Sequence, residues 1–338
     1  MTTNAIHVAL ASDNNYFEGL LTTAWSIARN CSRKNNLVLH ILNGGINEKS
    51  LRYLRNLLSP LGCETDIINI DQSASFKGFK PYHGNGTMTY ARLLLPDLLP
   101  TVSSVIYSDV DMLWLADIAE LWDTANHNSI LNYVANRSAP IPEEKKWFLD
   151  NGFAYNQPEM FCAGMIVLNL DKFRNERLHL KMLKTIQANN GNLPLCDETV
   201  LKAHMFGRSD KTPLPYRWLE ASGGKRDWSC DGFAVHFCAD APWKGIRHTH
   251  HMITDHHMLW HRYHAEARNI SLWESLRECN RLLDIVIGRP LYLAATNLAP
   301  VRAILHLAMI IRGKKGNIPC LDFYMRKFKL PKSTRHFW

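Results

Sequence analysis

The first seventy residues alternate short apolar runs with stretches of helical spacing, and this alternation restricts the fold more than any other feature. Apolar runs at 6–11 and 37–42 have the length and composition of strands, and the segment 63–70 offers a third strand. Helical spacing covers 20–29 and about 47–58 between them. Parallel strands need a crossover connection, for which a helix is the usual element. The order therefore predicts an α/β fold, Rossmann-like, with a mostly parallel sheet and helices on both faces.

Further elements extend this pattern towards residue 275. We predict a helix over 87–95 that ends at Pro96, buried strands over 102–107 and 165–170, and a short helix over 197–204. Residues 137–160 contain several prolines and mixed charge and predict a long loop, of the length that usually serves as a lid or a binding loop. We expect one catalytic domain over residues 1–275 and a separate C-terminal region over 276–338.

Two carboxylates, Asp109 and Asp111, follow the apolar run 102–107 directly. In extended backbone, positions i and i+2 point to the same side, so both side chains are expected at the edge where open α/β sheets bind ligands. Two like charges so close repel each other unless a cation lies between them. The pair therefore favours a divalent metal site, and the alternative is an acidic turn with both side chains in water.

Six short motifs occur along the chain in the order typical of one enzyme family: ASDNNY (11–16), TYARL (89–93), YSDVD (107–111), FCAG (161–164), DE (197–198) and HFC (236–238). Together they resemble the signatures of the retaining family-8 glycosyltransferases, especially the bacterial lipopolysaccharide galactosyl- and glucosyltransferases. The resemblance covers about residues 5 to 275. It implies a GT-A fold, a UDP-sugar donor and a Mn2+ ion, or Mg2+ in its place.

The resemblance assigns the metal to Asp109, Asp111 and His236. Carboxylate oxygens suit hard Mn2+, and imidazole is tolerated beside them; the alternative for His236 is a hydrogen-bonded histidine at a strand end. Tyr16 would stack on uracil, and Arg92 would hold hydroxyls or phosphate unless it forms a surface ion pair. The donor-binding residues implied by the resemblance are Ala11, Asp13, Asn15, Tyr16, Arg92, Asp109, Val110, Ala163, Gly164, Ala239, Trp243 and Lys244.

The predicted catalytic residues are Asp197 and Glu198. Asp197 corresponds to the family aspartate that binds the hydroxyls of the donor sugar, whereas Glu198 stands where these enzymes usually carry glutamine. A carboxylate at this position is either a nucleophile, which forms a glycosyl-enzyme intermediate, or a group that stabilises an oxocarbenium-like state. The sequence leaves both roles open.

Three other positions depart from the family pattern. Cys162 replaces the asparagine expected before Ala163, and Ala239 replaces a glycine. The phosphate-binding lysine expected before Pro242 and Trp243 is absent, and Lys244 is the candidate substitute.

A run of histidines over 248–264 includes His257 and His261 at positions i and i+4. The glutamate of a His-Glu-x-x-His site is absent, so an ordinary amphipathic helix is predicted here in preference to a second metal site.

The net charge of +8 belongs to the C-terminal end, because residues 301–338 contain nine Lys/Arg and one acidic residue while the first 300 contain 30 of each sign. An apolar segment over 298–311 precedes basic and aromatic residues, which predicts a basic amphipathic helix on an anionic membrane surface. The alternative is a helix packed on the core, followed by a solvated basic end. Without a basic excess elsewhere, nucleic acid is not the expected partner.

Eight scattered cysteines without a Cys-x-x-Cys motif suit reduced thiols in a cytosol, and neither a signal peptide nor an apolar stretch of membrane-spanning length is visible. We therefore expect a cytoplasmic protein, peripheral on the inner face of the cytoplasmic membrane.

These features predict a retaining hexosyltransferase that moves galactose or glucose from UDP onto a lipid-linked saccharide, such as lipopolysaccharide core. One alternative is an enzyme of the same family with a protein or glycogen-like acceptor. The alternative from a different class is a nucleotide-binding or nucleic-acid-binding protein without transferase activity.

Overall fold

The fold is described from a computed structural model of the chain. It describes residues 5–81, 86–135, 141–155, 160–221, 234–238, 241–244 and 255–279. The chain divides into two compact units, the first formed by residues 1–220 and 231–236 and the second by residues 221–230 and 237–338. The predicted C-terminal region, 276–338, lies outside the described residues from position 280 onwards.

The described strands are β1 (Ile6–Ser12), β2 (Leu37–Asn43), β3 (Glu64–Asn69), β4 (Ser104–Ser108), β5 (Met112–Trp114), β6 (Leu131–Ala135), β7 (Phe161–Asn169), β8 (Lys211–Leu214), β9 (Glu220–Ala221) and β10 (Ala234–His236). The described α-helices are α1 (Phe17–Asn30), α2 (Glu48–Leu58), α3 (Gln72–Ser75), α4 (Leu95–Leu98), α5 (Ile118–Thr124), α6 (Pro142–Asp150), α7 (Leu170–Asn175), α8 (Leu178–Ala188), α9 (Cys196–Met205), α10 (Asp255–Arg268) and α11 (Leu272–Glu278). The 3-10 helices used below are η1 (Asn14–Tyr16) and η4 (Met88–Leu94).

The first unit is built on a seven-stranded sheet with the order β3-β2-β1-β4-β7-β6-β8. Neighbouring strands pair in parallel except at β4–β7 and β6–β7, so β7 alone runs opposite to the others. This arrangement confirms the predicted mostly parallel sheet. Because β7 is reversed, its amino-terminal end lies at the same edge as the carboxyl ends of β1 and β4.

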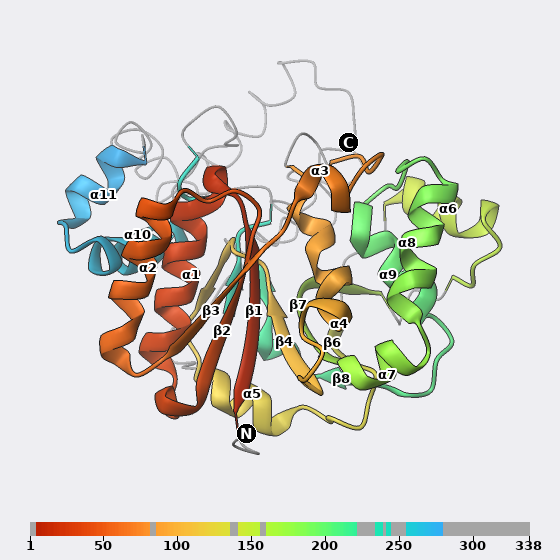
Figure 1. The fold of residues 1–338 in the computed structure, drawn as a ribbon, viewed down its shortest axis with the longest axis horizontal. Coiled ribbons are helices and arrows are strands. Elements are labelled where there is room, and N and C mark those ends of the chain that lie inside the picture. The colour runs from red at the N-terminus through yellow and green to blue at the C-terminus, as the bar shows by residue number, and fades with distance from the viewer. Residues whose placement is uncertain are drawn as a thin grey trace, which may run out of the picture. The chain divides into compact units, whose positions relative to one another are not determined.

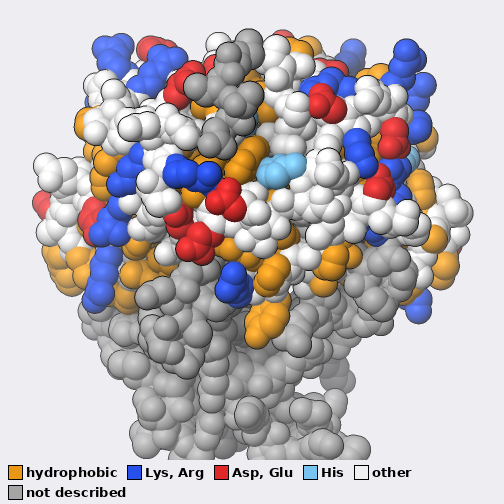
Figure 2. Space-filling model, turned by 90° about the horizontal axis from the view of Figure 1, so that it is seen from below, with side chains coloured by type: hydrophobic (Ala, Val, Ile, Leu, Met, Phe, Trp, Pro, Cys, Tyr) orange, Lys and Arg blue, Asp and Glu red, His pale blue; other side chains and the backbone are white. Residues whose placement is uncertain are grey.

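Helices cover both faces of this sheet. Successive residues of a strand point to opposite faces, and both Val8 and Ala9 of β1, like Ile106 and Tyr107 of β4, are buried. Helix α1 contacts β1 and α2, and α9 contacts β7 and α8 (Figure 1). Figure 2 shows one face of the molecule, on which basic and acidic side chains of the described residues are interspersed.

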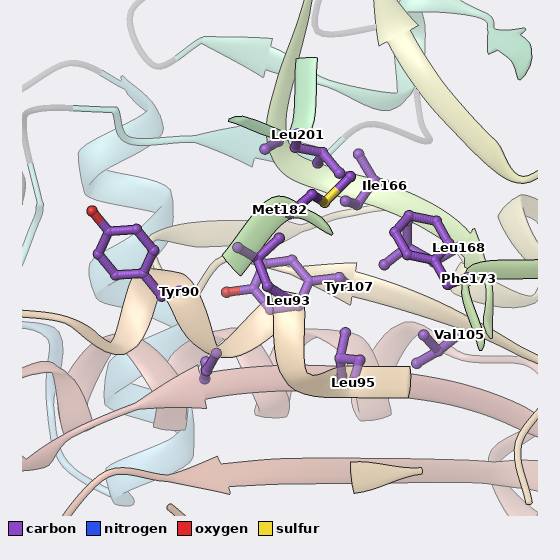
Figure 3. Close-up of a cluster of buried hydrophobic side chains, with 14 of the residues drawn as sticks. Tyr90, Leu93, Leu95, Val105, Tyr107, Ile166, Leu168, Phe173, Met182 and Leu201 are labelled. Atoms are coloured by element: carbon purple, nitrogen blue, oxygen red, sulfur yellow. The ribbon is translucent and has the colours of Figure 1, made fainter. Parts of the chain in front are cut away.

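A large core cluster lies between β4, β7 and the helices that follow them (Figure 3). Its fully or almost fully buried side chains include Tyr90, Leu93, Leu95, Val105, Tyr107, Ile166, Leu168, Phe173, Met182 and Leu201. Burying one such side chain stabilises the fold by about 1.5–3 kcal/mol. The cluster thus holds η4 and α9 rigidly against the sheet, and these two elements carry several of the predicted site residues.

The structure corrects two predictions about local structure. The helix predicted over 87–95 is the 3-10 helix η4, and Pro96 does not end it but lies in the first turn of the next helix, α4. The predicted loop over 137–160 contains a helix, α6, which begins at Pro142 and has two glutamates in its first turn. Proline and acidic residues both suit the first turn of a helix, where backbone N–H groups have no partner within the helix.

In the second unit, α10 and α11 pack against each other. Ser271 caps α11 and forms a capping box with Glu274. On α10, His261 and His264 each place Nδ1 2.9 Å from Ser275 Oγ of α11. Trp260 stacks on His264 at a centroid distance of 5.0 Å. Among the described residues, the groups of side chains able to hold a metal do not include these histidines, and no helix is long and apolar enough to cross a membrane.

Candidate functional site

The chain leaves the large sheet where β4 ends at Ser108. After Asp109, Val110 and Asp111 it enters β5, which pairs antiparallel with β10 in a second sheet of order β5-β10-β9. In this register His236, the last residue of β10, lies opposite Met112. The pairing therefore brings the histidine beside the two carboxylates, although 125 positions separate it from Asp111.

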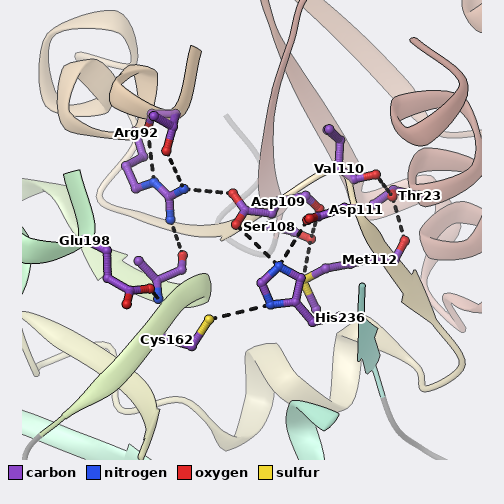
Figure 4. Close-up of polar contacts among 12 residues, drawn as sticks. Thr23, Arg92, Ser108, Asp109, Val110, Asp111, Met112, Cys162, Glu198 and His236 are labelled. Carbon is purple, nitrogen blue, oxygen red and sulfur yellow. Dashed lines mark hydrogen bonds and ion pairs between the residues drawn. The ribbon is translucent and has the colours of Figure 1, made fainter. Parts of the chain in front are cut away.

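Asp109, Asp111 and His236 form a compact group of potential metal ligands (Figure 4). His236 Nε2 lies 3.0 Å from Asp111 Oδ1 and 3.7 Å from Asp109 Oδ2, and the candidate ligand atoms all lie within 4.8 Å of one another. Although burial raises the pKa of Asp111, the adjacent His236 holds it below the ordinary value. Two carboxylates and one imidazole fit a hard divalent cation such as Mn2+ or Mg2+.

The turn that carries the two aspartates is fixed by hydrogen bonds from neighbouring elements. Thr23 Oγ1 of α1 lies 2.8 Å from the carbonyl oxygen of Val110 and 2.6 Å from that of Met112. Trp114 Nε1 donates to Ser108 Oγ at 3.0 Å. Val110 itself is buried and presents its carbonyl to α1. These contacts hold the two carboxylates at the edge of the sheet.

Arg92 of η4 lies in the interior, so the alternative prediction that it forms an ion pair at the surface is wrong. Its side chain is 4% exposed and bridges two carboxylates, with Nη2 2.8 Å from Asp109 Oδ1 and Nε 2.7 Å from Asp197 Oδ2. Nη1 donates to the carbonyl of Ala163, and the guanidinium lies 4.3 Å from the centroid of the Tyr107 ring. Arg92 therefore links the metal-ligand turn to α9.

Asp197 stands in the first turn of α9 and is almost fully buried. Burial raises its pKa to about 6, although Arg92 and a hydrogen bond from Thr89 Oγ1 act in the opposite direction. Cys196, directly before it, has φ +51°, a left-handed conformation that non-glycine residues rarely adopt. Such strain concentrates at sites where a side chain must be held in one direction.

Glu198 has both carboxylate oxygens engaged. Oε2 accepts the backbone N–H of Ala163 at 2.8 Å, and Oε1 lies 2.6 Å from Lys202 Nζ. Burial alone would raise the pKa of Glu198, but the Lys202 ammonium, the N–H of Ala163 and Arg92 together hold it below the ordinary value. Lys202 also contacts Glu144 of α6.

Two residues of this arrangement, Glu144 and Lys202, were not predicted from the sequence, and Thr89 was named only as part of the motif TYARL. The i, i+4 spacing of Glu198 and Lys202 on a predicted helix was a usable signal. No comparable signal pointed to Glu144, because its segment was predicted to be a loop.

The amino-terminal end of β7 completes this edge of the site. Asp109 N donates to the carbonyl of Gly164 at 2.7 Å, and Cys162 Sγ lies 3.5 Å from His236 Nδ1. A Cβ atom on Gly164 would lie 2.5 Å from His236 Cε1 and 3.0 Å from Asp109 Oδ2. Glycine at this position therefore allows the strand to approach the metal-ligand group closely.

We expect Gly164→Ala to lower the affinity for Mn2+ by about 10–100-fold, the range seen when groups that orient metal ligands are altered. The added methyl group would have to displace His236 or Asp109. Isothermal titration calorimetry with Mn2+ measures the loss, and circular dichroism checks the fold. Ser104→Ala, at the other end of β4, is the matched control and should bind Mn2+ like the unaltered protein. Unchanged Mn2+ affinity in Gly164→Ala would contradict this view of the site.

The turn after β1 lies beside the same group. Ala11 is buried near the end of β1, and Asp13 Oδ1 accepts the backbone N–H groups of Asn15 and Tyr16 at 2.9 and 3.2 Å, which caps η1. Asn15 is exposed and Tyr16 is half-buried. Burial, and then the negative charges of Asp111, Asp13 and Asp109, raise the pKa of Tyr16, which places this ring near the two carboxylates.

The remaining predicted donor-binding residues lie outside the first unit. Trp243 and Lys244 belong to the second unit, where Trp243 packs on Trp260 at a centroid distance of 5.6 Å. Ala239 lies outside the described residues. Donor contacts by these three residues remain predictions.

Comparison with known proteins gives concordant results. Residues 7–245 match the profile of glycosyl transferase family 8. A Haemophilus influenzae protein named by inference as a glycosyltransferase is 27% identical over 206 residues, which is 60% of this chain and 60% of that protein.

Two solved structures share the fold. The galactosyltransferase LgtC, solved with donor and acceptor sugar analogs, has a TM-score of 0.65 at 19% identity over 81% of this chain and 100% of that one. The bifunctional glycosyltransferase WbbM has a TM-score of 0.64 at 18% identity over 82% of this chain and 52% of that one. These likenesses confirm the predicted GT-A fold.

Proposed function

The chain belongs to glycosyl transferase family 8, and we propose that it transfers galactose or glucose from a UDP-sugar to a saccharide acceptor with retention of the α configuration. The observation that carries this proposal is the convergence of Asp109, Asp111 and His236 at one sheet edge, where Arg92 ties Asp109 to Asp197. A metal-ligand group and further buried carboxylates in one place suit a reaction with an anionic leaving group.

Asp109, Asp111 and His236 would hold Mn2+ or Mg2+. When bound, such an ion acts as a Lewis acid that neutralises charge on the leaving diphosphate. The turn from Ala11 to Tyr16 would bind the nucleoside, with the Tyr16 ring against the base. The half-buried position of Tyr16 beside the aspartates supports this role.

Asp197 would accept hydrogen bonds from the hydroxyls of the donor sugar, and Glu198 would act at the anomeric carbon. Both oxygens of Glu198 already accept strong hydrogen bonds, one of them from an ammonium. These bonds stabilise the negative charge, which lowers the nucleophilicity of the carboxylate, and they fix its orientation; the geometry therefore favours the role of charge stabiliser over that of nucleophile.

The function is tested by incubating the purified protein with a panel of UDP-sugars and Mn2+ and measuring the slow release of UDP. The proposed function predicts release from UDP-galactose or UDP-glucose that stops with excess EDTA. A protein that binds UDP but releases none from any donor would instead support a nucleotide-binding module without transferase activity.

We further propose that the acceptor is a lipid-linked saccharide and that the basic C-terminal residues hold the enzyme on an anionic membrane surface. Nine Lys/Arg with one acidic residue lie in 301–338, next to an apolar segment over 298–311. Each basic residue near an anionic leaflet contributes about 1 kcal/mol of attraction. Enzyme and acceptor would then meet within the plane of the membrane.

Truncation after Asn297 should produce a protein that no longer sediments with anionic vesicles but still releases UDP from its donor. Neutral vesicles and high salt are the controls, because electrostatic binding weakens with ionic strength. Replacing Arg312, Lys314 and Lys315 with glutamine should weaken vesicle binding in the full-length chain. Vesicle binding that survives both changes, or a truncated protein that fails to fold, would assign these residues to the core of the protein.

A further inference from the structure

Lys202 places an ammonium group between two carboxylates in the interior of the first unit. Its side chain is 1% exposed, and Nζ lies 2.6 Å from Glu198 Oε1 and 3.1 and 3.2 Å from the two oxygens of Glu144. Glu144 is fully buried, whereas the Glu198 side chain is 21% exposed. Taking such charges out of water costs several kcal/mol per ion, and only close pairing and further hydrogen bonds can offset this cost.

The ammonium is held in place from two helices. Lys202 lies one turn after Glu198 on α9, and Glu144 lies in the first turn of α6. Thr199 Oγ1 donates to Glu144 Oε1 at 3.1 Å, and the backbone N–H of Leu195 donates to Thr199 Oγ1 at 2.9 Å. A chain of hydrogen bonds thus connects α6, the start of α9 and the carboxylate of Glu198.

The two carboxylates differ in their response to this environment. Burial raises the pKa of Glu144 despite the nearby Lys202. The pKa of Glu198 is lowered: burial alone would raise it, but Lys202, the N–H of Ala163 and the Arg92 guanidinium of η4 together favour the charged form more strongly. Of the two groups, Glu144 is therefore the one that takes up a proton first as the pH falls.

We propose that Lys202 and Glu144 are positioning residues that keep Glu198 charged and fixed, so that Glu198 acts on the donor by its negative charge and not as a nucleophile. The inference rests on the proposed function of the same site. It assigns a role to a buried cation and to a second buried carboxylate that do not themselves contact the donor.

The first test does not require activity. Glutamate side chains are labelled with 13C at the carboxyl carbon, and the Glu198 signal is assigned by its loss in Glu198→Gln. Replacing the buried pair together, with Glu144→Gln and Lys202→Met, removes one charge of each sign and is expected to preserve the fold. The midpoint of the Glu198 titration should then rise by about one pH unit or more, because its counter-ion is lost.

A second variant covers the case in which the paired variant does not fold. Glu144→Gln alone removes the negative charge that competes with Glu198 for the Lys202 ammonium. The Glu198 midpoint should therefore fall below that of the unaltered protein. Lys146→Met, which removes an exposed pair with Asp150 on the same helix, is the control and should leave the midpoint unchanged. A Glu198 midpoint that does not move in either buried-site variant overturns the proposal.

The second test uses turnover. At mildly acidic pH, between the Glu198 midpoints of the unaltered protein and the paired variant, the paired replacement should lower kcat towards the level of Glu198→Gln, a loss of up to about tenfold, with little change in the KM for the donor. At higher pH the paired variant should recover, because Glu198 ionises again, whereas Glu198→Gln should not. In the Glu198→Gln background the paired replacement should cause no further loss.

A glycosylated peptide that contains Glu198, trapped with a slow donor and found by mass spectrometry, would overturn the charge-stabilising role. A protein that releases no UDP from any donor would reject the proposed function, and the NMR titration would still decide whether Lys202 sets the charge of Glu198.

Discussion

Asp111→Asn is expected to abolish sugar transfer and Mn2+-dependent UDP binding while the fold persists. The substitution preserves shape but removes one of two carboxylates from the group that contains His236. A metal that stabilises leaving-group charge contributes several kcal/mol, so a loss of about a thousandfold or more in kcat/KM is expected. UDP release and calorimetric binding of UDP with and without Mn2+ measure the two effects.

Asp123→Asn is the matched control for this substitution. It removes an aspartate of the same unit that pairs with Arg33 at 2.7 Å, with its side chain 62% exposed. Its transfer rate should equal that of the unaltered protein. Full transfer activity in Asp111→Asn, or in excess EDTA, would eliminate the metal role assigned to this turn.

Arg92→Met should destabilise the protein by about 3–5 kcal/mol, the cost of removing one partner from a buried ion pair. The substitution would leave Asp109 and Asp197 without the cation that bridges them. Urea unfolding measures the loss. Arg33→Met is the control, because a surface pair such as Arg33–Asp123 contributes at most about 1 kcal/mol. Equal losses from the two substitutions would show that the bridge contributes no special stability.

The destabilisation by Arg92→Met should also depend on pH. Burial already raises the pKa of Asp197 to about 6, and without the guanidinium this pKa should rise further above its unfolded value. The folded state then binds more protons than the unfolded state at mildly acidic pH. The stability of the variant therefore falls as pH rises through this range, and its deficit relative to the unaltered protein shrinks as the pH is lowered. A deficit that is constant with pH would mean that lost packing, not charge, is responsible.

Much of the fold follows from local patterns. The apolar runs that became β1, β2 and β4, and the helical spacing that became α2, predicted the parallel part of the sheet because each pattern is set by short-range periodicity. The 3-10 geometry of η4 was missed, since apolar spacing does not separate a 3-10 helix from an α-helix over so few residues. Helix α6 was not predicted, because the prolines and mixed charge of residues 137–160 are also typical of a loop.

The candidate site was predictable in a different way. The position of Asp109 and Asp111 at the end of a strand implied that they converge, whereas His236 was associated with them only through the resemblance to a family. The bridge formed by Arg92 and the contact between Lys202 and Glu144 join elements far apart in the chain. Their side-chain partners depend on the packing of η4, α6 and α9, which no local pattern encodes.

The reversed direction of β7 has a consequence for how this enzyme could diversify. Strands β6 and β7 form an antiparallel pair whose connection, which includes α6, lies at the same edge of the sheet as the site. An evolving chain could exchange this connection without altering any strand register, and so could change what approaches the donor. The exchange is constrained at one residue, because Glu144 and Glu198 both contact the ammonium group of Lys202. Changes in α6 that replace Glu144 would therefore be inherited together with changes in the surroundings of Glu198.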